Sequence, residues 1–215
     1  MDDDELLLID PDLFILLSAS GLLDRVVELL GFPIENVRRL AALPFMLKSS
    51  RQMRKKYPEE LRNKVLSDCD RIPGLDDAPT DADVMDRLIQ IDRIDDGEVL
   101  LYASVHEQKC WLLGSGDKRA MTALATAESV ADVRDGIAGR VISLEVVCEL
   151  LLKADDVNTI TKAFLPLKDV NVTLKSVFGS GGPFKTEDRL EAVASYHRDL
   201  EKTVGKDFLY RVESD

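Results

Sequence analysis

Three short apolar segments, each followed at once by a helical pattern, constrain the fold of this chain more than any other feature. They occupy residues 6–9, 110–114 and 140–144. Each is shorter than a typical helix and is bounded by turn-forming or capping residues, which favours a strand that is buried on both faces. Parallel strands of this kind are joined by helical crossovers that pack on the sheet. We therefore predict an α/β fold with a central parallel sheet.

The rest of the chain is predicted to be mainly helical. Apolar residues recur at helical spacing, and glycine and proline residues mark the ends of the helices. The predicted helices cover residues 12–30, 34–47, 50–69, 80–91, 99–108, 118–126, 129–137, 145–153, 155–165 and 186–205. Residues 170–185 are expected to be irregular. We expect residues 1–153 to form the α/β core, with a helical insertion around residues 34–92, and residues 154–215 to form a mainly helical extension packed on it.

Composition narrows the class of protein. The 215 residues carry a formal net charge of −12 and are 45% hydrophobic, so the chain can bury a core but its surface repels polyanions. Contact with nucleic acid would need a local basic patch or a metal ion.

Three cysteines without a CxxC spacing are typical of a reduced, cytoplasmic protein without a structural zinc site. No apolar run is long enough to cross a bilayer, and the acidic residues 1–5 differ from a secretory signal, so we expect no membrane contact.

Carboxylates follow the predicted strands at equivalent positions. Asp10 and Asp12 come directly after residues 6–9. Asp117 follows the second strand, and Glu145 follows the third. Glu98 stands in the first turn of the helix that leads into the second strand. Because parallel strands end at the same edge of a sheet, these side chains are expected to meet there.

A group of carboxylates without histidine or cysteine partners favours a hard divalent cation such as Mg²⁺ or Mn²⁺. Helix capping is the alternative role for Asp117, because aspartate is a common N-cap residue. For Glu98 the alternative is stabilisation of the helix dipole, which contributes about 0.3–1 kcal/mol without any catalytic role.

Four segments that contain these residues together resemble the PIN domain family. They are Leu-Leu-Leu-Ile-Asp10, Asp95-Asp-Gly-Glu98-Val-Leu-Leu-Tyr-Ala103, Trp-Leu-Leu-Gly-Ser-Gly-Asp117-Lys-Arg-Ala and Gly139-Arg-Val-Ile-Ser-Leu-Glu145. The resemblance extends over residues 5–152 and implies a PIN-like three-layer α/β/α fold. It also implies a metal-dependent endoribonuclease, which cleaves RNA phosphodiesters by a metal-activated water. Many members of that family are toxins of toxin–antitoxin pairs.

The resemblance implies catalytic and metal-binding roles for Asp10, Glu98 and Asp117, with Mg²⁺ or Mn²⁺ as the cofactor. The chain departs from the family pattern in two places. Asp12 stands where an Asn is usual, and Lys118 and Arg119 stand where the family often has a fourth acid. Three further carboxylates are candidates for additional ligands, namely Asp12, Asp96 and Glu145.

One strongly basic cluster lies within the predicted insertion. Its members are Lys48, Arg51, Arg54, Lys55, Lys56, Arg62 and Lys64. Arg54, Lys55 and Lys56 are the candidates for following an RNA backbone, and Lys118 and Arg119 could steady the scissile phosphate. The alternative is a solvated helix face that compensates an acidic body. No aromatic residue other than Tyr57 is interleaved with this cluster to stack on bases, which favours the solvated helix face.

Two other functions compete with the ribonuclease. The first is a catalytically weak or inactive PIN-like scaffold, whose acidic body and C-terminal helix bind a protein partner such as an antitoxin or a second copy of the chain. The second is a haloacid-dehalogenase-like phosphatase, because Asp10-Pro-Asp12 is similar to the nucleophile loop of that family. Phe14 and Met121 stand where a phosphatase would need a polar and an acidic residue, and they argue against it.

Overall fold

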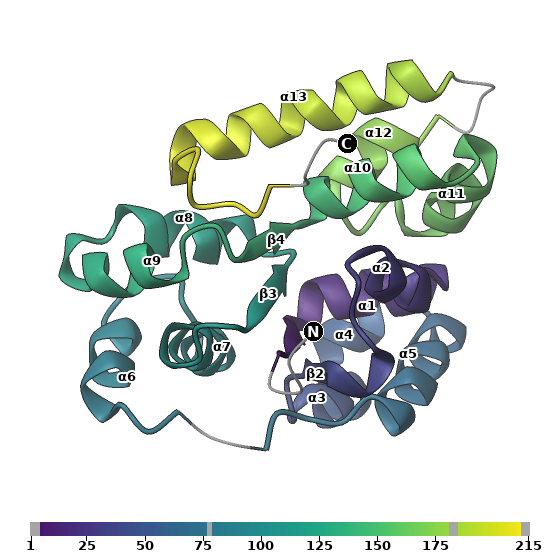
Figure 1. Ribbon diagram of the computed structural model, residues 1–215. Coiled ribbons are helices and arrows are strands. Elements are labelled where there is room, and N and C mark those ends of the chain that lie inside the picture. The colour runs from purple at the N-terminus through teal and green to yellow at the C-terminus, as the bar shows by residue number, and fades with distance from the viewer. Residues whose placement is uncertain (1–4, 77–78, 181–184, 212–215) are drawn as a thin grey trace.

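A parallel sheet lies at the centre of the protein (Figure 1). The structure is a computed structural model that describes residues 5–76, 79–180 and 185–211. Within these residues the sheet has four strands in the order β2-β1-β3-β4. The strands are β1 Leu7–Ile9, β2 Val37–Arg39, β3 Leu112–Ser115 and β4 Val141–Ser143. Leu7 pairs with Val37 on one side and with Leu112 on the other, so β1 is a central strand.

Helices make up most of the remaining structure. The helices of the first half are α1 Pro11–Ser20, α2 Leu23–Leu29, α3 Leu43–Ser49, α4 Arg51–Lys56, α5 Glu59–Arg71, α6 Ala82–Ile89 and α7 Asp96–Glu107. Those of the second half are α8 Lys118–Thr126, α9 Ala131–Ile137, α10 Leu144–Ala154, α11 Val157–Phe164, α12 Val172–Phe178 and α13 Thr186–Val204. The short 3-10 helices are η1 Ile34–Asn36, η2 Glu128–Val130 and η3 Leu165–Leu167. No helix in the described ranges is both long and apolar enough to span a membrane.

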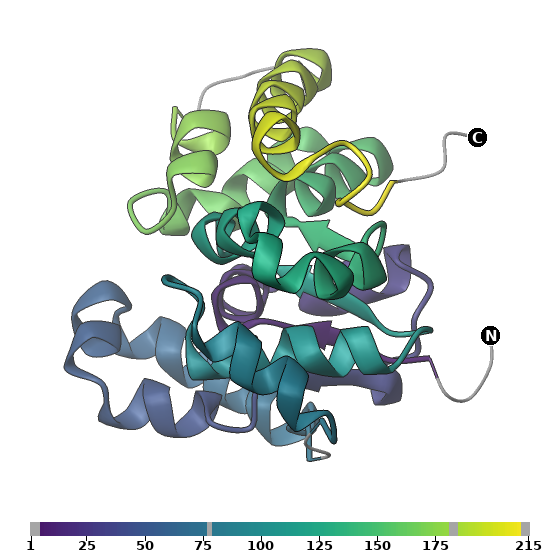
Figure 2. The same cartoon turned by 90° about the vertical axis from the view of Figure 1, so that its left-hand side faces the viewer.

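Strands β1, β3 and β4 contribute to two hydrophobic clusters because successive side chains point to opposite faces of a sheet. Leu7 and Ile9 belong to the first cluster, which also contains residues of α1, α2, α5 and α10 to α13. Leu8 belongs to the second, with residues of α6 to α9 and the end of α13. The helices α6 to α9 face the viewer in Figure 2. The three apolar segments contain β1, β3 and β4, whose residues are almost all buried, which confirms the α/β class and the parallel sheet.

Strand β2 was not predicted, because the helical pattern of residues 34–47 hides it. The prediction of one helix there is wrong. Residues 37–39 pair with β1 instead, and α3 begins only at Leu43, with Pro44 in its first turn. The buried guanidinium of Arg39 donates hydrogen bonds to the carbonyl oxygens of Leu40 and Cys69, which holds the end of β2 against α5.

Three other boundaries differ from the prediction for local reasons. The helix predicted over residues 12–30 is broken at Gly21, which has a φ of 78° and closes α1 in the left-handed conformation. The helix predicted over residues 50–69 is broken before Pro58, because a residue that precedes proline is driven into an extended conformation. Residues 172–178, predicted to be irregular, form α12, and the side chain of Asn171 caps this helix.

The C-terminal residues pack on the core and return to the sheet. Helix α13 lies against α8, α10 and α12, as Figure 1 shows for α10 and α12. Beyond this helix, Leu209 forms a parallel bridge with Val141 in β4. The N–H of Tyr210 donates to the carbonyl of Val141 at 2.8 Å. The predicted extension thus shares both hydrophobic clusters with the sheet.

This shared core gives a testable expectation for Phe178 in α12. The side chain is fully buried and its ring centroid lies 5.1 Å from that of Phe164. We expect Phe178→Ala to lower the free energy of unfolding of the whole chain by about 3–5 kcal/mol, because a cavity is left in the first cluster. Val172→Ala in the same helix is the control, since Val172 is 72% exposed. Urea unfolding that shows the same stability for both variants would contradict the shared core.

Candidate active site

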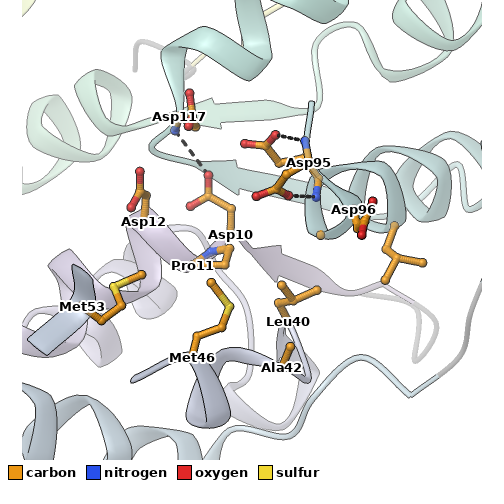
Figure 3. A pocket seen from close by; sticks show the side chains of 13 residues that line it. Asp10, Pro11, Asp12, Leu40, Ala42, Met46, Met53, Asp95, Asp96 and Asp117 are labelled. Atoms are coloured by element: carbon orange, nitrogen blue, oxygen red, sulfur yellow. Dashed lines mark hydrogen bonds between the residues drawn. The ribbon is translucent and has the colours of Figure 1, made fainter. Parts of the chain in front are cut away.

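A cavity of about 440 Å³ opens at the carboxyl ends of β1 and β3. Figure 3 shows how its side chains are arranged. Its acidic lining comes from the β1–α1 junction, the start of α7 and the turn after β3. The acidic residues are Asp10, Asp12, Asp95, Asp96, Glu98 and Asp117. The structure therefore brings together five of the six predicted ligand residues. The sixth, Glu145, does not line the cavity.

Asp10 joins the ends of two adjacent strands. Its carboxylate is 3% exposed. Oδ1 accepts a hydrogen bond from the N–H of Leu13 at 2.7 Å, which caps α1. Oδ2 accepts from the hydroxyl of Ser115 at 2.6 Å and from the N–H of Gly116 at 2.8 Å. Burial raises the pKa of Asp10 to about 6, although the hydrogen bonds from Ser115 and Leu13 oppose the shift.

The turn after β3 comes close to the start of α1. A Cβ atom at Gly116 would lie 3.0 Å from the backbone nitrogen of Leu13 and 3.2 Å from the Cβ of Asp12. Glycine at this position allows the turn to reach Asp10. The Gly-Ser-Gly sequence before Asp117 therefore sets the spacing between the two strand ends.

Asp117 caps α8 while it lines the cavity. Its Oδ1 accepts hydrogen bonds from the N–H groups of Arg119 at 2.7 Å and Ala120 at 3.1 Å. The backbone N–H of Asp117 in turn approaches Oδ2 of Asp10 at 3.4 Å, as the dashed line in Figure 3 shows. The capping role expected as an alternative is thus real, and it holds Asp117 with its backbone N–H toward Asp10.

Glu98 forms a capping box with Asp95 at the start of α7. The Glu98 side chain accepts from the N–H of Asp95 at 2.8 Å, and the Asp95 side chain accepts from the N–H of Glu98 at 2.9 Å. Burial, together with the nearby charges of Asp95, Asp117 and Asp10, raises the pKa of Glu98 to about 8, although the hydrogen bond from the Asp95 N–H opposes the shift. Asp96, in the same helical turn, also lines the cavity.

The cations near the cavity differ in their environments. Lys56 Nζ lies 3.8 Å from Asp12 at the rim, while Arg54 and Lys55 on α4 are exposed. Arg119 lines a second hollow, which shares Asp95, Glu98 and Asp117 with the first. Tyr57, the aromatic residue interleaved with the basic cluster, is 1% exposed and is not available to stack on a base.

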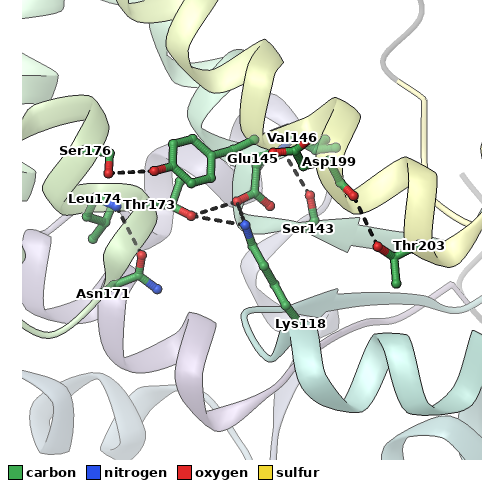
Figure 4. Close-up of polar contacts among 11 residues, drawn as sticks. Lys118, Ser143, Glu145, Val146, Asn171, Thr173, Leu174, Ser176, Asp199 and Thr203 are labelled. Carbon is green, nitrogen blue, oxygen red and sulfur yellow. Dashed lines mark hydrogen bonds and ion pairs between the residues drawn. The ribbon is translucent and has the colours of Figure 1, made fainter.

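Lys118 points away from the cavity and pairs with Glu145 (Figure 4). Glu145 is fully buried, and its Oε1 accepts from Lys118 Nζ at 2.7 Å and from the Thr173 hydroxyl at 2.9 Å. The Lys118 ammonium also lies 5.1 Å from the ring centroid of Tyr196. This cluster connects α8 and α10 with α12 and α13. Glu145, a predicted additional ligand, is therefore not placed to bind an ion in the cavity. Lys118, a predicted RNA contact, is not placed to reach a phosphate there.

One part of the cavity lining was not predicted. Its apolar residues are Pro11, Leu40, Ala42, Met46, Met53 and Leu100. Leu40, Ala42 and Met46 lie directly after β2, so the missed strand hid their position. Pro44, which fits the first turn of a helix, is the signal that could have moved the start of α3 beyond β2.

The donor atoms suit a hard divalent cation. All six acidic side chains offer oxygen, which Mg²⁺ and Mn²⁺ prefer. Within the described ranges, no three His, Cys, Asp or Glu side chains are already arranged to hold one ion. Mg²⁺ commonly binds through one or two carboxylates and keeps several waters, so the residues present fit an ion of that kind.

Comparison of the chain with models of protein families, with curated proteins and with solved structures finds no match.

The raised pKa of Glu98 predicts how stability changes with pH. Folded Glu98 keeps its proton up to a pH of about 8, whereas the ordinary value is 4.5. The folded state therefore binds more protons between these values, and stability must fall as the pH rises through them. We expect the melting temperature of the wild type, relative to Glu98→Gln, to fall between pH 5 and pH 9 in the presence of a chelator.

Glu107→Gln is the control for this measurement. Glu107 lies at the other end of α7, and hydrogen bonds from Thr80 lower its pKa. Folded and unfolded chains both carry a charged Glu107 above pH 5, so its contribution stays constant. A difference between wild type and Glu98→Gln that does not change with pH would show that Glu98 is not buried among like charges.

The buried pair of Lys118 and Glu145 predicts an asymmetric response to mutation. Lys118→Met leaves the Glu145 carboxylate buried without its partner, and we expect a loss of about 3 kcal/mol in the free energy of unfolding. Replacing both residues, as Lys118→Met with Glu145→Leu, should recover most of that loss. Urea unfolding checks this. Equal destabilisation by the single and the double variant would mean that the charges do not interact.

Proposed function

We propose that the protein is a PIN-like, divalent-cation-dependent endoribonuclease. One observation carries the proposal: carboxylates from three separate segments of the chain line a single cavity at the carboxyl ends of adjacent parallel strands. The sheet with hydrophobic clusters on both faces is compatible with the three-layer α/β/α arrangement of that class. Roles as the toxin of a toxin–antitoxin pair and as a homodimer would follow from the resemblance alone.

Mg²⁺ or Mn²⁺ would be held by Asp10, Glu98 and Asp117, with Asp12 and Asp96 close to them. When bound, such an ion supplies positive charge to the scissile phosphate and lowers the pKa of an attacking water. Glu98 must release its proton for this arrangement, because its pKa of about 8 leaves it protonated at neutral pH in the absence of positive charge. Binding of the cation should therefore strengthen as the pH rises.

The chain itself supplies a fixed carboxylate for the ion and a positive charge for the substrate. Asp10, with a pKa of about 6, is ionised at neutral pH and is fixed by Ser115 and Gly116. It is therefore charged and held in place, as a ligand of the ion needs to be. Arg119, in the adjoining hollow, supplies a positive charge for the RNA phosphates.

The two competing functions make different demands on the same residues. A non-catalytic scaffold is favoured by the capping bonds, because Glu98 and Asp117 have a structural role without any ion. A phosphatase would use Asp10 as a nucleophile, but it would also need a polar and an acidic residue where this chain has Phe14 and Met121. The ribonuclease therefore accounts for more of the cavity than either alternative.

Replacing Asp117 tests the proposal. Asparagine caps a helix about as well as aspartate, so Asp117→Asn should keep α8 intact and remove only the charge. We expect Mn²⁺-stimulated cleavage of single-stranded RNA to fall by at least about 100-fold, the usual effect of removing one preorganised electrostatic contact. Asp81→Asn is the control, because Asp81 caps α6 in the same way and does not line the cavity.

Equal activity of Asp117→Asn and wild type would reject the site. Calorimetric titration of the wild type with Mn²⁺ separates the remaining cases. Saturable binding that Asp117→Asn weakens supports the cation site, whereas the absence of such binding together with the absence of cleavage would favour the scaffold.

A further inference from the structure

The cavity has two chemically different walls. The carboxylates occupy one wall, and the other consists of Leu40, Ala42, Met46 and Met53. In Figure 3, Met46 and Met53 lie on the side of the cavity opposite to Asp117. They come from α3 and α4, which follow β2 in the chain. A cation site needs only the acidic wall, so the apolar wall requires a separate explanation.

Met46 and Met53 are less buried than the core residues near them, although Met53 also packs against the first hydrophobic cluster. Both are partly exposed, while neighbouring apolar residues of the same segment, such as Leu43 and Leu47, are fully buried. Methionine is flexible and polarizable, and its thioether makes favourable contacts with aromatic rings. Two such side chains at the lining of a polar cavity form a surface suited to a flat, aromatic group.

The charges around the apolar wall indicate what carries that aromatic group. The helix that contributes Met53 also carries Arg51, Arg54, Lys55 and Lys56, although the whole chain has a net charge of −12. Arg54 and Lys55 are exposed, and Lys56 reaches the rim of the cavity at Asp12. A polyanion that bears aromatic groups fits this combination, and single-stranded RNA has both properties.

We propose that Met46 and Met53 form a base-binding wall, which holds the nucleobase of a nucleotide next to the phosphate that is cleaved. This inference rests on the proposed ribonuclease function and adds a substrate requirement to it. The base must be unpaired, because a base in a duplex does not expose its face to such a wall.

The wall also predicts which bases are preferred. The side chains of Leu40, Ala42, Met46 and Met53 lack groups that could form strong hydrogen bonds to the edges of a base. Discrimination by this wall therefore depends on the area of contact. A purine offers the larger ring system, so the wall favours a purine over a pyrimidine without selecting between adenine and guanine.

An RNA that lacks a single base tests the wall. In the first step, the full-length protein is incubated with Mn²⁺ and a short single-stranded RNA, and the cleavage site is mapped. The same RNA is then made in two further forms, each with one abasic ribose, placed on one side or the other of that site. We expect removal of one of these bases to lower kcat/KM of the wild type about tenfold, within the usual range for stacking of one base. The variant with both Met46→Gln and Met53→Gln should show less than about a twofold difference between the two RNAs.

The glutamine replacements keep the length of the unbranched side chains at partly exposed positions, and a thermal melt confirms that the variant is folded. The variant with Met46→Leu and Met53→Leu keeps an apolar wall of similar volume and should retain most of the discrimination. Met85→Ala is a further control, because Met85 is partly buried on α6 and does not line the cavity.

The outcomes separate the two proposals. Failure of the wild type to cleave the unmodified RNA would overturn the ribonuclease function, and the base-binding wall with it. Cleavage that is insensitive to both abasic positions, or a glutamine variant that keeps the full discrimination, would overturn the wall alone.

Discussion

The buried carboxylate of Asp10 is the interaction on which the geometry of the cavity depends. One oxygen binds the first turn of α1, and the other binds Ser115 and Gly116 after β3. A buried carboxylate is costly unless donors surround it, so this side chain needs all three groups in place. The bonds therefore fix the end of β1 relative to the end of β3. The turn that positions Asp117 follows directly from this contact.

The same contact also places several carboxylates close together in the cavity. It brings Asp10 and Asp117 near Glu98, and the pKa values of Asp10 and Glu98 rise as a result of burial and of the neighbouring charges. A protein selected only for stability would pair such groups with cations or replace them. At the rim, Lys56 approaches Asp12. Deeper in the cavity, the charges of Asp10 and Asp117 still raise the pKa of Glu98. An arrangement that lowers stability in this way is expected at a functional site.

The sequence predicted the elements whose pattern is local and failed where contacts distant in the chain decide the structure. The three apolar segments and the cap of α8 could be recognised because strand burial and capping leave short-range signals. Strand β2 could not, because only pairing with Leu7–Ile9 makes residues 37–39 extended. The placement of Glu145 was missed for the same reason, since its partner Thr173 lies 28 residues away in a segment predicted to be irregular.

Glu145 also explains how the cavity remains acidic despite the two cations that follow Asp117. If Lys118 pointed into the cavity, its ammonium would neutralise one of the carboxylates proposed to hold the metal ion. Instead the buried Glu145 binds Lys118 on the other side of α8, where Tyr196 and Thr173 complete its surroundings. A cation in place of the fourth acid of PIN domains is therefore compatible with a cation-binding cavity. The C-terminal helices α12 and α13 thus contribute to the proposed site without lining it, because they supply the contacts that keep Lys118 away.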